Sequence, residues 1–142
     1  MDNFKQLQDG MLIGPQPTEQ DLQQAKQQGI KTVIDFRMPS ETPVPNADLA
    51  AKSGLDYANI PVNKASLNTD QIDELDRVMQ EKPGPYLLHC ATGARAAMLL
   101  ALSKAKKHHW DAERTFEEAG AMGYDLKTSP EFSAFVVQAA AH

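Results

Sequence analysis

Apolar and polar positions along this chain follow two alternating periods, which predicts that strands and helices succeed one another. A run rich in β-branched and apolar residues between Gly29 and Pro39 predicts a buried strand over residues 31–36. Two shorter runs predict strands over residues 57–60 and 86–89. Such alternation is typical of a mainly parallel sheet covered by helices, with any site at the carboxyl ends of the strands. We therefore predict an α/β fold with three layers.

Helices are predicted where apolar residues recur every three or four positions. Thr18 and Asp21 resemble a capping pair at the start of the first helix. The helix that follows Arg95 is apolar on nearly all sides as far as Ala101, which predicts that it is buried. The remaining predicted helices cover about residues 46–53, 68–81, 112–119 and 129–141.

Length and composition indicate one globular domain over residues 1–142. The chain has 142 residues, of which 42% are hydrophobic and 23% charged, so it can bury a core of its own and a second domain is not expected. The formal net charge of −5 opposes binding to nucleic acid or to an anionic membrane, so we expect neither as a partner. Any anion-binding site must therefore be a local feature.

The cysteine count and the amino terminus bear on location. A single cysteine excludes an internal disulfide, and the first residues lack the basic start and apolar stretch of a secretory signal. No apolar run approaches the ~20 residues of a membrane span. We expect a cytoplasmic protein, with an exported form only if the natural precursor is longer.

Cys90 lies between a predicted strand and a predicted helix, separated from the helix by a small-residue loop. Backbone N–H groups of such a loop and of the first helical turn have no helical partners, so they can bind an oxyanion. The same field stabilises a thiolate, which is the nucleophilic form of cysteine. Arg95 adds a planar cation suited to two oxygens of a tetrahedral anion. The residues assigned to this anion-binding loop are Ala91, Thr92, Gly93 and Ala94.

Taken alone, Cys90 has a simpler interpretation. A lone cysteine at the end of a buried strand is usually a small core residue. The spacing of His89, Gly93 and Arg95 around it favours a functional site, because a core cysteine has no use for an arginine at the start of the next helix. The candidate catalytic residues are therefore Cys90 and Arg95.

The order His-Cys-x-x-Gly-x-Arg between a strand and an apolar helix resembles the phosphate-binding loop of the cysteine-dependent phosphatases, including the tyrosine and dual-specificity enzymes. The wider chain resembles a bacterial branch of that superfamily, the phosphatase-like domain of beta-lactamase-hydrolase-like proteins. This resemblance extends from about residue 14 to residue 126. It is carried, besides the loop, by residues 14–18, 29–37, 54–57, 60–62, 83–85 and 123–126. It implies a cysteine-phosphatase-like fold and hydrolysis of phosphate monoesters through a phosphocysteine on Cys90.

Two features depart from that resemblance. Five residues separate the cysteine from the arginine in the phosphatases, whereas four do so here, as in the rhodaneses, which carry a persulfide on a cysteine. Related phosphatases often supply a general acid from an aspartate after a strand that ends like Ile60-Pro61-Val62, but this chain has Asn63 and Lys64 there. Neither side chain can donate a proton as a carboxylic acid does.

Four further side chains are candidates for supporting roles. Asp35 and Glu41 are carboxylates that could replace the missing acid, although a solvated or capping role is the simpler expectation for each. Arg37 could make a second contact to an anionic substrate or form a surface ion pair with Asp35 or Glu41. His89 faces away from Cys90 if the strand continues, so we expect it to hold the loop by hydrogen bonds.

Three functions remain open at this point. The first is a phosphatase, the second a rhodanese-like sulfurtransferase that acts through a Cys90 persulfide, and the third a module that binds a phosphorylated or sulfated ligand without turnover. Each implies an anionic partner, either a phosphate ester or a sulfane-sulfur donor. We expect no cofactor. We also expect no metal, because the adjacent His108 and His109 would point about 100° apart on a helix and make a poor metal pair. The oligomeric state is left open.

Overall fold

Five strands form one sheet in the order β1-β2-β5-β3-β4, in which β1 is antiparallel to β2 and all other neighbours are parallel. The computed structural model describes residues 3–7, 9–41 and 46–140, apart from the side chain of Asn46. The elements, in chain order, are β1 (Lys5–Gln6), β2 (Leu12–Gly14), α1 (Glu19–Gln27), β3 (Thr32–Asp35), η1 (Pro39–Glu41), α2 (Asn46–Lys52), β4 (Asp56–Asn59), η2 (Lys64–Ser66), α3 (Asp70–Glu81), β5 (Tyr86–His89), α4 (Ala94–His108), α5 (Ala112–Ala121), η3 (Leu126–Thr128) and α6 (Pro130–Ala139), where η denotes a short 3₁₀ helix.

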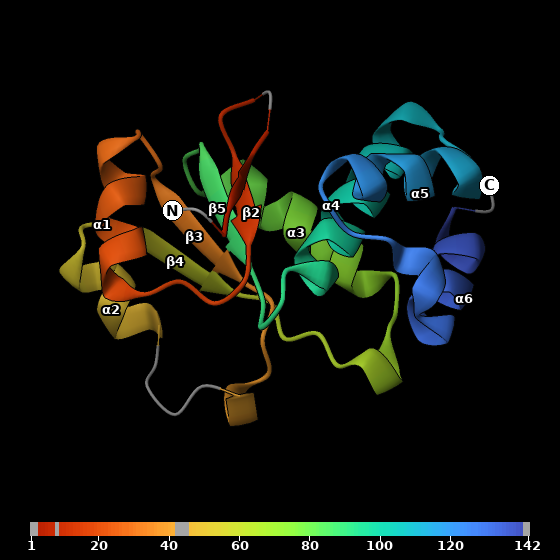
Figure 1. Cartoon of the computed structure of the whole chain (residues 1–142), viewed down its shortest axis with the longest axis horizontal. Helices are drawn as coiled ribbons and strands as arrows, with labels where there is room; N and C mark the ends of the chain where they lie inside the picture. Colours follow the sequence, from red (N-terminus) through yellow and green to blue (C-terminus); the bar gives the residue numbers. More distant parts are fainter. Residues whose placement is uncertain (1–2, 8, 42–45, 141–142) are drawn as a thin grey trace.

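Helices cover both faces of the sheet, so successive strand residues are buried on opposite sides (Figure 1). On β3, Val33 packs in the core formed with α1 and α2, whereas Ile34 packs in the larger core formed with α3 and α4. On β5, Leu87 likewise packs in the core with α1 and α2, and Leu88 packs in the core with α3 and α4. Helices α5 and α6 pack against α4. This confirms the predicted α/β fold with a mainly parallel, helix-flanked sheet.

The strand register brings distant parts of the chain together at the carboxyl edge of the sheet. His89 at the end of β5 pairs with Asp35 of β3 on one side and with Gly14 of β2 on the other. Asp35 pairs in turn with Asn59 of β4. Cys90 therefore follows the central strand at the middle of this edge, as the alternation of strands and helices predicts.

The elements that sequence patterns predict are present, together with two strands and three short 3₁₀ helices that were not predicted. Thr18 and Asp21 form the expected capping box at the start of α1. Strands β1 and β2 were not predicted, because two and three residues are too few to show a period. The last helix is predicted to end at about residue 141, which lies outside the described part of the chain.

Candidate active site

The loop after β5 wraps around the sulfur of Cys90. The Gly93 N–H donates a hydrogen bond to Cys90 Sγ at 3.0 Å, and the Ala94 N–H donates to Thr92 Oγ1 at 3.3 Å. Ala91 and Thr92 are exposed at the loop surface, whereas Cys90 is fully buried beneath it. The hydrogen bond from Gly93 directs a backbone N–H dipole at the sulfur from the start of α4.

Gly93 is held in a conformation that only glycine adopts readily. Its φ is +104°, and a Cβ at this position would lie 1.9 Å from Tyr124 Oη. The Tyr124 hydroxyl donates to the carbonyl oxygen of Thr92 at 3.1 Å. Tyr124 therefore braces the loop from the turn after α5, a role that the sequence alone did not indicate.

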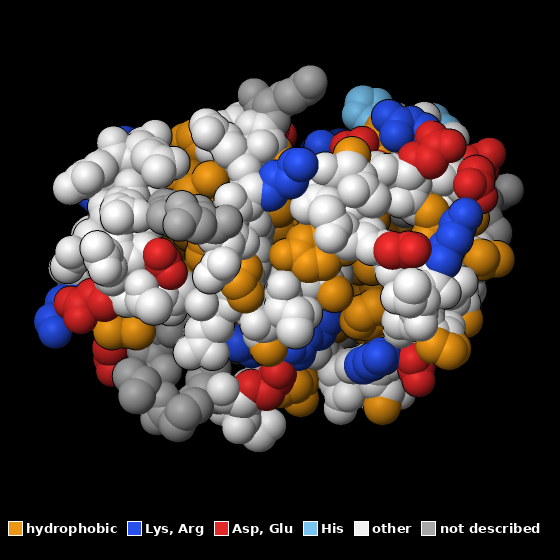
Figure 2. Space-filling model, viewed as in Figure 1, with side chains coloured by type: hydrophobic (Ala, Val, Ile, Leu, Met, Phe, Trp, Pro, Cys, Tyr) orange, Lys and Arg blue, Asp and Glu red, His pale blue; other side chains and the backbone are white. Residues whose placement is uncertain are grey.

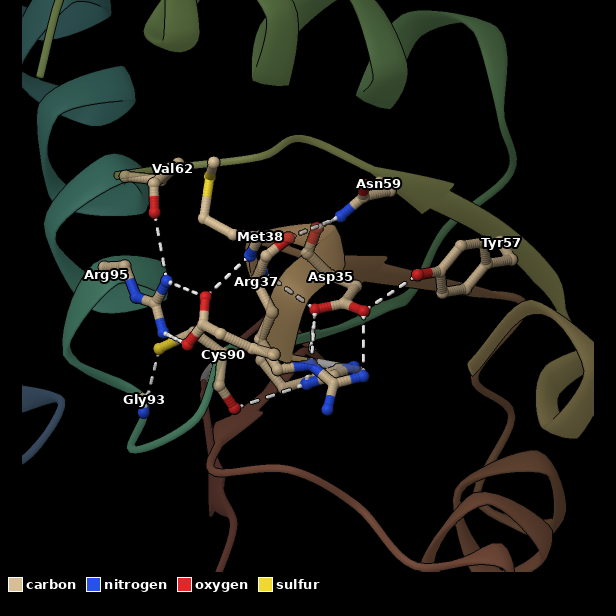
Figure 3. A network of polar contacts seen from close by, with 11 residues as sticks. Asp35, Arg37, Met38, Tyr57, Asn59, Val62, Cys90, Gly93 and Arg95 are labelled. Atoms are coloured by element: carbon tan, nitrogen blue, oxygen red, sulfur yellow. Dashed lines mark hydrogen bonds and ion pairs between the residues drawn. The ribbon is translucent and has the colours of Figure 1, made fainter. Parts of the chain in front are cut away.

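The guanidinium of Arg95 is held by Glu41 in a two-point ion pair. Arg95 Nη1 lies 2.8 Å from Glu41 Oε2, and Nη2 lies 2.7 Å from Oε1. Nη1 also donates to the carbonyl oxygen of Val62 at 3.0 Å, and the Met38 N–H donates to Glu41 Oε2 at 2.7 Å (Figure 3). These contacts fix the orientation of the guanidinium next to Cys90.

The ion pair keeps Glu41 charged. Hydrogen bonding to Arg95 lowers the pKa of Glu41 to about 2, against the effect of desolvation. The same contact raises the pKa of Arg95, and the neighbouring Cys90 sulfur acts in the same direction. A carboxyl group that is ionised at neutral pH cannot donate a proton, so this structure does not present Glu41 as the general acid that the sequence allowed.

Asp35 and Arg37 form an ion pair inside the protein rather than at its surface. Both side chains have no exposed area, and Asp35 Oδ1 and Oδ2 accept from Arg37 Nε at 3.0 Å and Nη2 at 3.1 Å. The Tyr57 hydroxyl donates to Asp35 Oδ2 at 2.8 Å. These hydrogen bonds lower the pKa of Asp35 although burial opposes them. Arg37 therefore pairs with Asp35, one of its two expected partners, but the expected surface position is wrong because the pair lies in the core. For the same reason Asp35 is not the solvated carboxylate that the sequence favoured.

His89 lies next to this buried pair. Its Nδ1 is 3.4 Å from the carbonyl oxygen of Cys90 and 3.8 Å from Asp35 Oδ1. Burial lowers the pKa of His89 to about 4, so the imidazole is neutral at pH 7. These contacts agree with the expected role of His89 in holding the loop.

A cleft of about 590 Å³ opens above the loop. Thr92, Ala94, Arg95 and Glu41 line one part of it, and the loop after β4 contributes Asn63. Figure 2 shows Lys and Arg side chains gathered in a hollow at the lower centre of the molecular face, with an acidic side chain at the rim. This volume is within the range of sites that bind small molecules.

Three comparisons with known proteins bear on this geometry. A family model described as "Beta-lactamase hydrolase-like protein, phosphatase-like domain" matches residues 3–107. The chain belongs to this family. A beta-lactamase hydrolase-like protein of Xylella fastidiosa (strain Temecula1 / ATCC 700964) is 28% identical over 125 residues. The match covers 84% of this chain but 29% of that protein, so the phosphatase-like domain spans less than a third of its curated relative.

Solved structures share the fold of this phosphatase-like domain. A DUF442 protein from Shewanella putrefaciens CN-32 superposes with a TM-score of 0.80 and 22% identity, over 98% of this chain and 89% of that one. P. aeruginosa TpbA, solved in complex with pTyr, gives a TM-score of 0.74 and 18% identity, over 94% of this chain and 82% of that one. At these identities the likeness concerns the fold, which is that of cysteine-based phosphatases.

The phosphatase-like domain offers no protonated carboxylic acid among the described residues of its cleft. Glu41 is the one carboxylate in that lining, and it is ionised. Asn63 lines the cleft where related phosphatases often place an aspartate, but its Oδ1 accepts from the Ala65 N–H at 2.9 Å and so caps η2. The site therefore combines a guanidinium, loop N–H groups and a candidate nucleophile without a positioned acid.

No group of three His, Cys, Asp or Glu side chains could hold a metal ion among the residues that the structure describes. No helix in the described ranges is long and apolar enough to cross a membrane.

Proposed function

We propose that this domain is a cysteine-dependent phosphatase that hydrolyses phosphate monoesters through a phosphocysteine on Cys90. The observation that carries the proposal is the position of the Cys90 sulfur, which accepts the Gly93 N–H at the head of α4 and lies beside the guanidinium of Arg95. A phosphoryl group at this point would meet a nucleophile, a helix N-terminus and a cation together.

The reaction would proceed in two displacements. The Cys90 thiolate attacks phosphorus, the P–O ester bond breaks, and the leaving alkoxide takes a proton from water. Arg95 and the loop amides stabilise the charge on the non-bridging oxygens. Water then attacks the phosphocysteine, the P–S bond breaks, and inorganic phosphate and the thiolate are released.

Lack of a positioned acid makes the leaving group important. Protonation by a carboxylic acid typically contributes about 10²–10⁴-fold, and this site would forgo that contribution for alkyl esters. Aryl phosphates leave as stabilised phenolates, so we expect turnover to rise steeply as the pKa of the leaving phenol falls.

Phosphate release from a series of substituted aryl phosphates tests the proposal. We expect hydrolysis that vanadate inhibits and that Cys90→Ser abolishes, with a strong dependence of kcat on the leaving group. Ser103→Ala is a control because Ser103 is buried on α4 and bonds Asp76, away from the cleft. No hydrolysis of any aryl phosphate by the wild-type domain would refute the proposal.

A rhodanese-like sulfur transfer is the second candidate, favoured by the four-residue interval between Cys90 and Arg95 and by the ionised state of Glu41. In this reaction the Cys90 thiolate attacks the outer sulfur of thiosulfate, the S–S bond breaks and sulfite leaves. The resulting Cys90 persulfide passes its outer sulfur to cyanide, forming thiocyanate and restoring the thiolate. No proton donor is needed for the sulfite, so the absence of an acid carries no cost.

Intact mass of the reduced protein after incubation with thiosulfate distinguishes the two candidates. A gain of one sulfur that maps to Cys90 and is removed by cyanide would favour sulfur transfer. An unchanged mass, with Cys90 still alkylated at neutral pH, would favour phosphoryl transfer. Parallel assays of phosphate and thiocyanate release give the ranking of the two activities.

A further inference from the structure

The cleft extends beyond the anion-binding loop to a second wall formed by α6 and η2. Phe132 in the first turn of α6 and Lys64 at the start of η2 both line it. Met38, which is partly exposed, lies in the lining as well and adds apolar surface. The cleft therefore has one part that suits an anion and another that is apolar with a cation.

Phe132 belongs to a part of the chain that the family model does not match. The matched segment ends at residue 107, whereas α6 covers Pro130–Ala139. The start of α6 is set locally, because Ser129 Oγ accepts the Phe132 N–H at 3.4 Å and Pro130 occupies the first helical turn. The aromatic wall of the cleft is thus supplied by this carboxyl-terminal helix.

Lys64 has an exchangeable partner. Its Nζ lies 5.2 Å from the centroid of the Phe132 ring and 3.6 Å from Glu131 Oε2. The side chains of Lys64 and Glu131 are 53% and 52% exposed, so their ion pair is screened by solvent and contributes little. An anionic group on a ligand that enters the cleft can replace Glu131 at Lys64.

We propose that Lys64 and Phe132 form a subsite for the body of the substrate, which carries an apolar group and a second anionic group. The reacting anion lies at Arg95, the apolar group packs on Met38 and Phe132, and a carboxylate lies at Lys64. Lys64 thereby determines specificity for small organic molecules with two acidic groups over those with one. This inference rests on the proposed function, because it takes the loop as the position of the phosphate.

Binding to the Cys90→Ser variant, measured by calorimetry, tests the subsite without turnover. The ligands are inorganic phosphate, phenyl phosphate, and phenyl phosphates that carry a carboxylate or a neutral carboxamide at the meta or para position. We expect at least one carboxylate to bind about fivefold more tightly than its carboxamide, as one partly screened ion pair allows. Raising the salt concentration should reduce this gain.

Variants in the Cys90→Ser background show which residues produce the higher affinity for the carboxylate ligand. Lys64→Gln should abolish the advantage of the carboxylate, and Glu131→Gln should increase it by removing a competing anion. Lys52→Gln is the matched control, since Lys52 forms a similarly exposed ion pair with Glu19 on the α1 and α2 side of the molecule. Phe132→Leu, which keeps most of the apolar volume, should weaken the binding of phenyl phosphate relative to that of inorganic phosphate.

The outcomes separate the subsite from the phosphatase proposal. If inorganic phosphate and phenyl phosphate bind but no carboxylate improves affinity, or if Lys64→Gln retains the improvement, the subsite is refuted and the phosphatase proposal stands. If none of the ligands binds, both are overturned.

Discussion

Glu41 and Arg95, which are 54 residues apart in the chain, form a two-point ion pair next to the only cysteine. The pair occupies both Nη atoms of the guanidinium, and the side chain of Arg95 is 14% exposed. Glu41 therefore does two things at this site. It orients the cation, and its negative charge reduces the attraction of the cation for an incoming anion.

Replacing Glu41 by Gln should strengthen anion binding. The amide keeps one hydrogen-bond acceptor for Arg95 and removes a charge a few ångströms from the anion. Removing that charge from a partly screened cleft is worth about 1 kcal/mol, which corresponds to about fivefold in affinity. Competitive inhibition by inorganic phosphate at pH 7 measures this effect. Glu19→Gln, a change on α1, is the control, and unchanged or weaker inhibition in Glu41→Gln would contradict the prediction.

Replacing Gly93 by Ala should distort the loop. The left-handed φ costs an L-residue about 1–2 kcal/mol, and the new Cβ would meet Tyr124, so we expect destabilisation by roughly 2 kcal/mol or more together with slower alkylation of Cys90. Urea unfolding and iodoacetamide labelling are the measurements. Gly29→Ala has a similar φ of +100° with no atom within 4 Å of the Cβ, and should show the strain alone. Gly120, in α5, has neither a positive φ nor an atom within 4 Å of the new Cβ, so Gly120→Ala should not destabilise the protein. Equal losses in all three variants would disprove this account.

The buried pair of Asp35 and Arg37 should show strong coupling. Arg37→Met leaves a carboxylate in the core without its main partner, and such a change typically costs about 3–5 kcal/mol. Asp35→Asn leaves a buried guanidinium in the same way. The double variant should recover much of the loss, because neither charge then remains. Urea unfolding of the four proteins gives the coupling energy, and strictly additive losses would argue against the prediction.

Tyr57→Phe removes one hydrogen bond to Asp35 and should lower the free energy of unfolding by about 1 kcal/mol, which urea unfolding also measures.

Stability should fall with acid in the range set by His89. The unfolded imidazole titrates near pH 6.5, whereas burial lowers the pKa of His89 to about 4 in the folded protein. Between these values the unfolded state binds more protons than the folded state. The contribution of His89 to the free energy of unfolding is therefore fully present above pH 6.5 and decreases as the pH falls towards 4. The loss approaches roughly 3 kcal/mol at the lower limit. Urea unfolding at several pH values measures it.

His89→Asn is the control for this pH dependence. Asparagine can place an amide near the position of Nδ1 but does not titrate, and the other histidines are retained. The variant should have nearly constant stability between pH 6.5 and about 5, although its stability at pH 7 can be lower. Nearer pH 4 the lowered pKa values of Glu41 and Asp35 reduce the stability of both proteins. An equal acid dependence in the variant and the wild type would assign the effect to other groups.

The sequence by itself determined the parts of the site that are local in the chain. The order of strand, loop and helix around Cys90 depends on residues within one or two turns of each other, so periodicity and the spacing from His89 to Arg95 predicted it well. The alternation of apolar runs likewise predicted the α/β fold and the position of Cys90 at the carboxyl edge of the sheet. Strands β1 and β2 were not predicted, since they are too short to show a period.

Only the tertiary structure decided which distant groups meet. Nothing in the sequence shows that Glu41 binds Arg95, that Asp35 and Arg37 are buried together, or that Tyr124 and Phe132 reach the loop and its cleft. The register of the sheet and the packing of the helices and loops around it set these contacts, and both depend on the summed burial of many side chains rather than on any local pattern. Whether a carboxylate is an acid, a counter-ion or a structural group is determined by its surroundings, because burial and neighbouring charges set its pKa.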